Sequence, residues 1–255
     1  MTYSGDTERQ AILRDEAIRK SKKARKYPLL DLYFSSVNAV LKSGMRLLDV
    51  GCGTAHVIQE LAKCKTSELV GLDLSAAMLR IAKSNTRSLQ NISLIRADGF
   101  RLPFRDCIID IVINRLAEYS PQEAYRILKT DGIFIEYSLG PHASKEIAEF
   151  FKERIERSSF FFPRNPKRWK REASQHVVDA GFTILSMKDY VKNRYYEDEN
   201  ALMNLIEMVP LVKDFDRVRD RRTIQELARK YKKDQGIRIT WHYYVIVAKK
   251  TIGDR

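Results

Sequence analysis

The chain contains 255 residues, of which 44% are hydrophobic and 31% charged, an ordinary composition for a globular protein with a sizeable core. It has no run of about 18 apolar residues, so we expect no transmembrane helix. The three cysteines (Cys52, Cys64 and Cys107) form no C-x-x-C pair and no cluster with histidine, which argues against a disulfide framework and a zinc site.

The start of the chain and its net charge bear on location and partners. Residues 1–10 are polar and lack the apolar segment of a secretory signal, which together with the cysteine usage predicts a cytoplasmic protein. Lysine and arginine number 46 against 33 acidic residues, giving a net charge of +13. Such a surplus favours polyanions such as RNA, DNA or a membrane surface, but a solvated basic surface explains it equally well.

The first 43 residues have helical character. Residues 6–26 carry apolar side chains at helical spacing and end in a basic run, and Pro28 interrupts the pattern. A second helical pattern covers residues 29–41, and Ser43-Gly44 is a stop signal. We therefore predict two N-terminal helices.

From residue 44 onward, short apolar segments alternate with helical patterns. Alternation of this kind indicates right-handed βαβ crossovers and a parallel sheet covered on both faces, an α/β fold of the doubly wound type. The expected strands are 46–50, 68–73, 92–97, 108–114 and 133–138, with a turn at 130–132, and the expected helices are 55–63, 75–84 and 121–128.

The second half of the chain is less regular. The expected elements are helices at 144–158 and 172–180, an aromatic loop at 160–163 followed by the basic stretch 164–171, a strand at 182–190 and a last strand at 237–249. Residues 198–233 hold two helical patterns broken at Pro210. Because no internal repeat and no low-complexity linker occurs, we predict one domain over 1–255.

The segment from Leu47 to Ala55 is the most informative in the chain. An apolar run meets Asp49 and then two glycines, Gly51 and Gly53, separated by one residue. This pattern predicts a buried strand that ends in a tight turn where backbone can approach a ligand. The dinucleotide pattern G-x-G-x-x-G would need glycine at position 56, where the chain has histidine.

This turn resembles the first motif of class I S-adenosylmethionine (SAM)-dependent methyltransferases, acidic-x-Gly-x-Gly-x-Gly. Asp49, Gly51 and Gly53 match it, and Ala55 replaces the third glycine. Asp73, at the end of the second strand, matches the acid that binds the ribose hydroxyls in that family. Asp98 and Gly99 match the motif that contacts adenine, with Phe100 placed to stack.

Further motifs place the resemblance in the ubiquinone-biosynthesis ("type 11") branch over residues 44–140. They are the run from Leu102 to Asn114 and the turn from Leu128 to Gly132. The resemblance implies a seven-stranded Rossmann-like sheet of order 3-2-1-4-5-7-6 with an antiparallel last strand and a helical insertion before it, at about 195–235. It also implies a helical lid at 1–43, a cofactor-binding core at 44–140 and a substrate-side half at 141–255.

The resemblance implies SAM as cofactor, S-adenosylhomocysteine as product, and no metal. The residues expected at the cofactor are Asp49, Gly51, Cys52, Gly53, Asp73, Leu74, Met78, Asp98, Gly99, Phe100, Asn114 and Arg115. For Met78 the alternative is a place in the core.

Catalytic candidates are few. His142 and His242 are the candidate bases, and a hydrogen-bonded structural role is the alternative for each. Glu118 and Tyr119 follow the fourth strand and are expected to orient the substrate.

Three functions remain open on the sequence. The first is methyl transfer from SAM to an oxygen, nitrogen or sulfur nucleophile of a small molecule by in-line displacement. The second is methylation of RNA, which the net charge of +13 supports. The third is a non-catalytic protein that has the fold and binds SAM.

Overall fold

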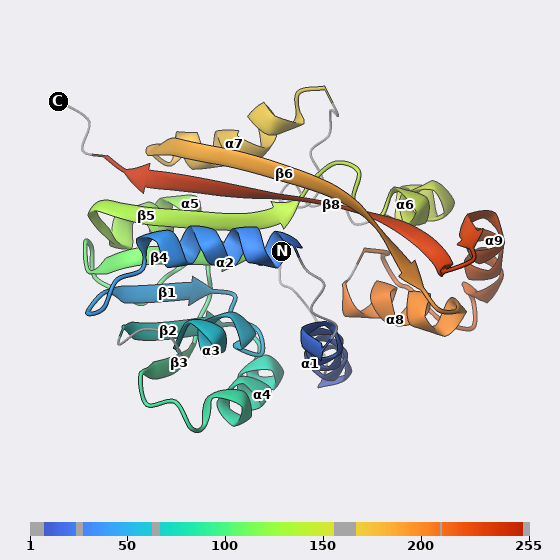
Figure 1. Ribbon diagram of the computed structural model, residues 1–255, viewed down its shortest axis with the longest axis horizontal. Helices are drawn as coiled ribbons and strands as arrows, with labels where there is room; N and C mark the ends of the chain where they lie inside the picture. Colours follow the sequence, from blue (N-terminus) through green and yellow to red (C-terminus); the bar gives the residue numbers. More distant parts are fainter. Residues whose placement is uncertain (1–7, 24–27, 63–66, 156–166, 210, 252–255) are drawn as a thin grey trace. The chain divides into compact units, whose positions relative to one another are not determined.

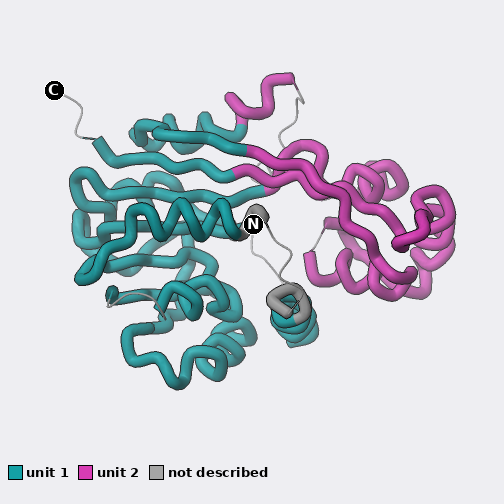
Figure 2. Tube along the Cα trace, in the orientation of Figure 1, with its two compact units in different colours: residues 1–138, 173–188, 245–255 teal, residues 139–172, 189–244 magenta. Residues whose placement is uncertain are grey.

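The computed structural model describes residues 8–23, 28–62, 67–155, 167–209 and 211–251. The chain divides into two compact units, shown in Figure 2. Unit 1 comprises residues 1–138, 173–188 and 245–255, and unit 2 comprises residues 139–172 and 189–244. The predicted division into a lid, a cofactor-binding core and a substrate-side half stays a prediction.

The described strands form one sheet of order β3-β2-β1-β4-β5-β8-β6, with the short β7 paired to β8 (Figure 1). Their bounds are β1 Arg46–Val50, β2 Glu68–Asp73, β3 Ile92–Arg96, β4 Ile109–Arg115, β5 Leu128–Leu139, β6 Phe182–Tyr196, β7 Lys232–Lys233 and β8 Gly236–Lys250. Strands β3, β2, β1, β4 and β5 pair in parallel. The arrow of β8 runs opposite to that of β5 in Figure 1. The predicted strand order and the antiparallel last strand are confirmed, with β7 as an addition.

The helices occur in the predicted order along the chain. Their bounds are α1 Glu8–Lys23, α2 Pro28–Val40, α3 His56–Ala62, α4 Ala76–Thr86, α5 Pro121–Ile127, α6 Lys145–Phe151, α7 Trp169–Asp179, α8 Glu199–Met208 and α9 Arg221–Tyr231, with a 3-10 turn η1 at Lys152–Arg154. Helices α8 and α9 form the predicted insertion between β6 and β8.

Three local predictions need correction or lie outside the structure. The turn expected at 130–132 lies inside β5, where Asp131 has φ +64° and the pairing with β4 shifts register. The helix expected over 144–158 ends at Phe151 and continues only as η1. Residues 156–166, with the predicted aromatic loop and the start of the basic stretch, lie outside the described residues, as does Pro210.

The centre of unit 1 is the parallel sheet. Side chains from β1 and β4, such as Leu48 and Val112, are 0% exposed, because a parallel sheet carries helices on both faces. Helix α4 begins where the sequence predicts, since the Ser75 hydroxyl accepts a hydrogen bond from the Met78 amide at 3.2 Å.

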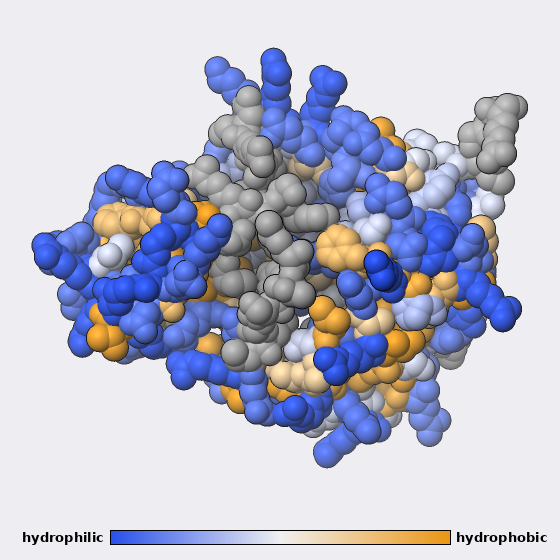
Figure 3. Space-filling view, turned by 180° about the vertical axis from the view of Figure 1, so that it is seen from behind, coloured by the Kyte–Doolittle hydropathy of each residue, from blue (hydrophilic) through white to orange (hydrophobic). Residues whose placement is uncertain are grey.

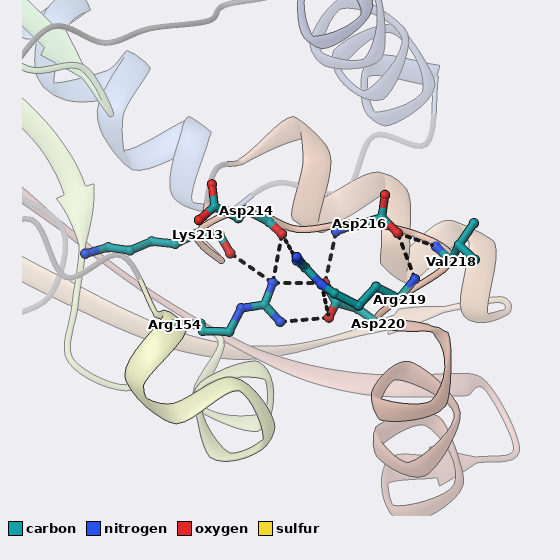
Figure 4. Close-up of polar contacts among 7 residues, drawn as sticks. All are labelled: Arg154, Lys213, Asp214, Asp216, Val218, Arg219 and Asp220. Atoms are coloured by element: carbon teal, nitrogen blue, oxygen red, sulfur yellow. Dashed lines mark hydrogen bonds and ion pairs between the residues drawn. The ribbon is translucent and has the colours of Figure 1, made fainter.

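In unit 2, a partly buried ion pair between Arg154 and Asp220 fixes the loop between α8 and α9 (Figure 4). Arg154 donates to both carboxylate oxygens of Asp220, at 2.7 and 3.0 Å, and to the carbonyls of Lys213 and Asp214. The hydrogen bonds from Arg154 lower the pKa of Asp220 to about 2. The charged pair therefore persists at neutral pH and braces the insertion.

The visible surface in Figure 3 is mostly hydrophilic, with hydrophobic residues in smaller clusters. Among the described residues, no helix combines the length and apolar character needed to cross a membrane.

Candidate functional site

The turn between β1 and α3 has an unusual backbone. Gly51, Gly53 and Ala55 have φ values of +74°, +53° and +63°, the left-handed region that favours glycine. A side chain at Gly51 would place its Cβ 2.0 Å from the Cβ of Ala117, whereas a Cβ at Gly53 would meet no atom of the described residues within 4 Å. Gly51 therefore allows a close approach between two loops of the protein, and the backbone of Gly53 is not covered by any described residue.

The turn is anchored on the end of β2. The amides of Gly51 and Cys52 both donate to the carbonyl of Leu72, at 2.7 and 2.9 Å. The Cys52 side chain is buried, and its burial raises the pKa of the thiol. A protonated, enclosed thiol is a poor nucleophile, so Cys52 contributes packing and a backbone amide to the turn.

Asp73 connects β2 to this turn. Its carboxylate accepts from the Gly53 amide at 2.8 Å through one oxygen and from the Ser75 amide at 2.8 Å through the other. A carboxylate is a bidentate acceptor, and two neighbouring ribose hydroxyls are a pair of donors. Asp73 is half-buried and remains suited to a pair of ribose hydroxyls.

The loops after β3 and β4 lie together. A side chain at Gly99 would place its Cβ 2.8 Å from the carbonyl of Glu118, and the Ser120 amide donates to the carbonyl of Gly99 at 3.1 Å. The exposed Asp98 accepts from the Phe100 amide at 2.9 Å, which shapes this turn. Glu118 is half-buried in the same region.

The apolar candidates differ in exposure. Leu74 and Phe100 are 52% and 45% exposed, which is unusual for large hydrophobic residues and consistent with contact to a ligand ring. Met78 is 0% exposed. Its side chain fills the core beneath α4, so we do not retain it as a surface for adenine.

At the carboxyl end of β4, Asn114 and Arg115 have different surroundings. Asn114 is 2% exposed, and its amide donates to the carbonyl of Val50 at 3.1 Å, which ties β4 to the start of the glycine turn. Arg115 is half-buried, and its charge acts on the carboxylate of Asp49.

Tyr119 belongs to the interior of unit 1. It is 1% exposed, and its hydroxyl donates to Glu136 at 2.8 Å, while His176 contacts the same carboxylate oxygen at 2.8 Å. This buried cluster links the loop after β4 to β5 and α7. It gives Tyr119 a structural role, so we do not retain it among the residues that orient the substrate.

The two candidate bases lie together in unit 2. Their rings stack with centroids 5.3 Å apart, and the His142 amide donates to Nδ1 of His242 at 3.3 Å. Nε2 of His242 lies 3.4 Å from Asp189, and burial lowers the pKa of His242. His242 is 1% exposed whereas the ring of His142 is exposed. Of the two, only His142 has the accessibility that a base requires, and its catalytic role stays a prediction.

Two buried polar atoms at the carboxyl edge of the sheet have no hydrogen-bond partner among the described residues: Oδ1 of Asp49 and the hydroxyl of Tyr33. Burial raises the pKa of Asp49 to about 7, with the charge of Asp73 adding to the shift and that of Arg115 opposing it. Unpaired buried polar groups are costly, so they point to a bound ligand. Tyr33 could not be predicted from the sequence, because a tyrosine within an apolar helical pattern is usually a core residue.

Asp49→Asn is expected to remove one component of the pH dependence of stability. The pKa of Asp49 is about 7 in the folded chain, above its ordinary value, so the folded state retains a proton that the unfolded state releases. Stability from this group is therefore fully present below about pH 4 and is lost as the pH rises through about 7. The unfolding free energy of the wild type minus that of Asp49→Asn should be larger at pH 4 than at pH 8, by roughly 3 kcal/mol.

Urea denaturation of both proteins without ligand, at pH 4 and pH 8, measures this difference. The exposed Asp98 offers a control, since Asp98→Asn makes the same chemical change at a side chain that solvent reaches. The same difference at both pH values for Asp49→Asn would contradict the raised pKa of Asp49.

Within the described segments, no group of three or more histidine, cysteine, aspartate or glutamate residues is placed to hold a metal ion. The expectation of metal-free chemistry stays a prediction.

Comparison with known proteins agrees with this geometry. A family model for a methyltransferase domain matches residues 47–132, which contain the glycine turn, Asp73 and Asp98. A demethylmenaquinone methyltransferase of Staphylococcus saprophyticus is 36% identical over 104 residues, covering 37% of this chain and 45% of that protein. The chain thus matches less than half the length of this relative.

Two solved structures share the fold. A protein of Bacillus halodurans C-125, proposed to be a methyltransferase, aligns with a TM-score of 0.62 and 18% identity over 86% of this chain and 99% of its own. A geranyl diphosphate C-methyltransferase of Streptomyces coelicolor A3(2), solved with Mg²⁺, geranyl diphosphate and S-adenosylhomocysteine, aligns with a TM-score of 0.53 and 17% identity over 88% and 80%. The glycine turn, the strand order and the family match together identify residues 47–132 as a methyltransferase domain.

Proposed function

We propose that the chain transfers a methyl group from SAM to a nucleophilic atom of a small molecule. The observation that carries the proposal is the cradle at the glycine turn. Gly53 offers left-handed backbone where a Cβ would meet no atom of the described residues within 4 Å, and the carboxylate of Asp73 accepts from its amide at 2.8 Å. Backbone that approaches a ligand this closely beside a bidentate acceptor suits a nucleoside.

The surrounding residues fit the rest of the cofactor. Asp73 would accept from the ribose hydroxyls, and Asp98 from the adenine amino group. Leu74 and Phe100 are exposed on the loops after β2 and β3 and would contact the adenine ring. The unpaired, buried Oδ1 of Asp49 suits the positively charged end of the cofactor.

SAM supplies an activated methyl group on a sulfonium, which a nucleophile displaces in line. The task of the chain is to hold donor and acceptor in that geometry and to exclude water. The glycine turn and the carboxylate of Asp73 would hold the adenosine end of the donor, which provides the first of these. An acceptor that carries a proton also needs a base, and His142 is our candidate.

The relatives favour a small acceptor. The staphylococcal protein is named for a quinone substrate, and the Streptomyces neighbour methylates carbon of an isoprenoid diphosphate. Carbon therefore joins oxygen, nitrogen and sulfur as an acceptor atom in the proposal. The RNA alternative is supported by the net charge of +13. The glycine turn and Asp73 add no support for RNA as the acceptor.

Binding and transfer assays together test the proposal. Calorimetry should detect binding of SAM and S-adenosylhomocysteine, and radiolabelled SAM should transfer label to demethylmenaquinone or another small phenolic or quinol acceptor. Label found instead in tRNA, with binding that falls steeply as salt rises, would establish the RNA alternative. Cofactor binding without transfer to either class would favour the non-catalytic alternative, and no binding by folded protein would refute all three.

A further inference from the structure

Val218 is the most exposed large hydrophobic residue that the structure describes. It lies in unit 2, in the loop between α8 and α9, and is 85% exposed, whereas Leu185, the next in order, is 55% exposed. Figure 4 shows its side chain pointing away from the ion pair of Arg154 and Asp220. A single exposed apolar residue is common on protein surfaces, so the argument depends on what holds Val218 and what surrounds it.

The loop presents Val218 on a braced backbone. The amides of Val218 and Arg219 both donate to one carboxylate oxygen of Asp216, at 2.9 and 2.7 Å. The Asp216 amide donates in turn to Asp220 at 2.9 Å, and Arg154 donates to both oxygens of Asp220. A backbone rearrangement that turned the valine inward would break these hydrogen bonds. The exposure of Val218 is therefore a property of the folded loop.

The segment that follows Val218 has an apolar face and a cationic face. Ile224 and Leu227 of α9 are 0% exposed, and the helix packs on α6 and α8. The opposite face, which we call the cationic face, consists of the exposed charged residues of α9 and β7. They are Arg221, Arg222, Glu226, Arg229, Lys230, Lys232 and Lys233. Six of these seven side chains are basic, so the face has a strong positive charge.

Most of this charge is not neutralised by neighbouring acids. Lys230 pairs with Glu149, and Arg222 pairs with Glu226 at 3.1 Å. The side chains of the other four basic residues form no hydrogen bond and no ion pair with any described residue. Like charges held close together on a helix repel one another, and an anionic partner relieves that repulsion. The cationic face therefore suits a polyanion.

Val218 distinguishes between two kinds of anionic partner. Surfaces that bind RNA combine cations with exposed aromatic rings that stack on bases. Tyr231, the aromatic residue of α9, is half-buried, and its hydroxyl donates to Glu149. An anionic membrane instead offers charged headgroups above hydrocarbon, which together suit cations beside an exposed apolar side chain. Val218 comes shortly before Arg221, the first residue of α9, so the two kinds of group are adjacent.

We propose that the cationic face docks on an anionic lipid surface, with Val218 inserted between the headgroups. Each basic residue near such a surface strengthens binding by about 5-fold, and burial of the valine side chain adds about 10-fold. Binding of this kind is reversible and weakens as salt rises. The inference goes beyond the proposed function and stands without it, since docking needs neither SAM nor a methyl acceptor.

Cosedimentation of the full chain with lipid vesicles tests the proposal. The protein should bind vesicles of phosphatidylcholine with phosphatidylserine at least about 10-fold more tightly than vesicles of phosphatidylcholine alone, and added salt should remove the difference. Val218→Asn should weaken binding to the anionic vesicles by about 10-fold. Val191 on β6, which is 50% exposed, supplies the control, and Val191→Asn should leave binding unchanged.

A charge variant separates the cationic face from the net charge of the chain. Combining Arg229→Gln, Lys232→Gln and Lys233→Gln should weaken binding to the anionic vesicles by about 100-fold. The control variant replaces three exposed basic residues of unit 1 by glutamine: Lys83, Arg87 and Arg105. It lowers the net charge by the same amount and should change binding by about 3-fold or less.

A gain of signal at position 218 gives a second measurement. Val218→Trp should show a shift of tryptophan emission to shorter wavelength when anionic vesicles are added, because the ring leaves water. The two natural tryptophans, Trp169 and Trp241, are 8% and 5% exposed and contribute a background that the wild type measures. Val191→Trp should show no shift. If Val218→Asn does not fold, this variant takes its place.

Several results would overturn the proposal. They are no binding of the wild type to anionic vesicles, an equal loss in the two charge variants, and unchanged binding in Val218→Asn together with no shift in Val218→Trp. Binding to tRNA without binding to vesicles would assign the cationic face to nucleic acid instead. All of these measurements are made without SAM, so none of their outcomes depends on the proposed function.

Discussion

Asp73→Ala is expected to weaken the binding of SAM and S-adenosylhomocysteine by at least about 100-fold. The variant loses two charge-assisted hydrogen bonds to the ribose hydroxyls, each worth about 1.5–3 kcal/mol. It also loses the acceptors that hold the Gly53 and Ser75 amides at 2.8 Å, so the glycine turn itself is less well fixed. Calorimetric titration of each ligand measures the effect, and circular dichroism checks that the fold is intact.

Glu68 provides the control for this experiment. It begins the strand that Asp73 ends, is exposed, and pairs with Arg46 at 2.8 Å. Glu68→Gln removes a carboxylate from the opposite end of β2 and should leave both affinities unchanged, because a surface ion pair contributes about 0–1 kcal/mol to stability and lies away from the cradle. An Asp73→Ala variant that binds within about 3-fold of wild type would remove Asp73 from the ribose site.

The two glycines of the turn are expected to respond differently to the same substitution. Gly51→Ala should lower the unfolding free energy by about 3 kcal/mol or more. The left-handed conformation costs an alanine about 1–2 kcal/mol, and a Cβ 2.0 Å from that of Ala117 adds the cost of overpacking, about 1–3 kcal/mol. Denaturant unfolding measures the loss, and Gly51→Ala combined with Ala117→Gly should recover part of it.

Gly53→Ala tests the second glycine, where a Cβ meets no atom within 4 Å in the part of the chain that the structure describes. The stability loss should be only about 1–2 kcal/mol, from the backbone conformation alone. Affinity for SAM should nevertheless fall by at least about 10-fold, because the methyl group occupies the space the cofactor would use. Full affinity in Gly53→Ala would show that no ligand approaches the backbone there.

The elements of unit 1 could be predicted closely because their signals are local. Buried parallel strands are continuous apolar runs, and Ser75 caps its helix as the sequence indicates. The start of β5 could not be predicted in this way. Thr130-Asp131-Gly132 has the composition of a turn, yet the strand pairs with β4 on both sides of it, at Leu128 and at Ile133, and absorbs the turn as a bulge.

For the predicted cofactor residues, too, some features could be predicted from the sequence and others could not. Spacing alone placed Asp49, Gly51 and Gly53 at one strand end, because residues close in sequence there are close in space. Burial then separated Leu74 and Phe100, which are exposed, from Met78, which is not. Exposure depends on what the rest of the chain places over a residue, so no local pattern reveals it.

The sequence by itself determined the fold class, since that follows from periodicity and turn chemistry. Its resemblance to a known family implied the order of the strands and the turn that we propose as the nucleoside site. Only the tertiary structure decided which polar groups lack partners. Tyr33 and Asp49 belong to different elements and meet through the packing of α2 on the sheet. His142 and His242 are likewise distant in sequence, yet their rings stack. Whether a hydrogen-bonding group is satisfied depends on every neighbour that folding brings to it, and that information is not local to any stretch of the chain.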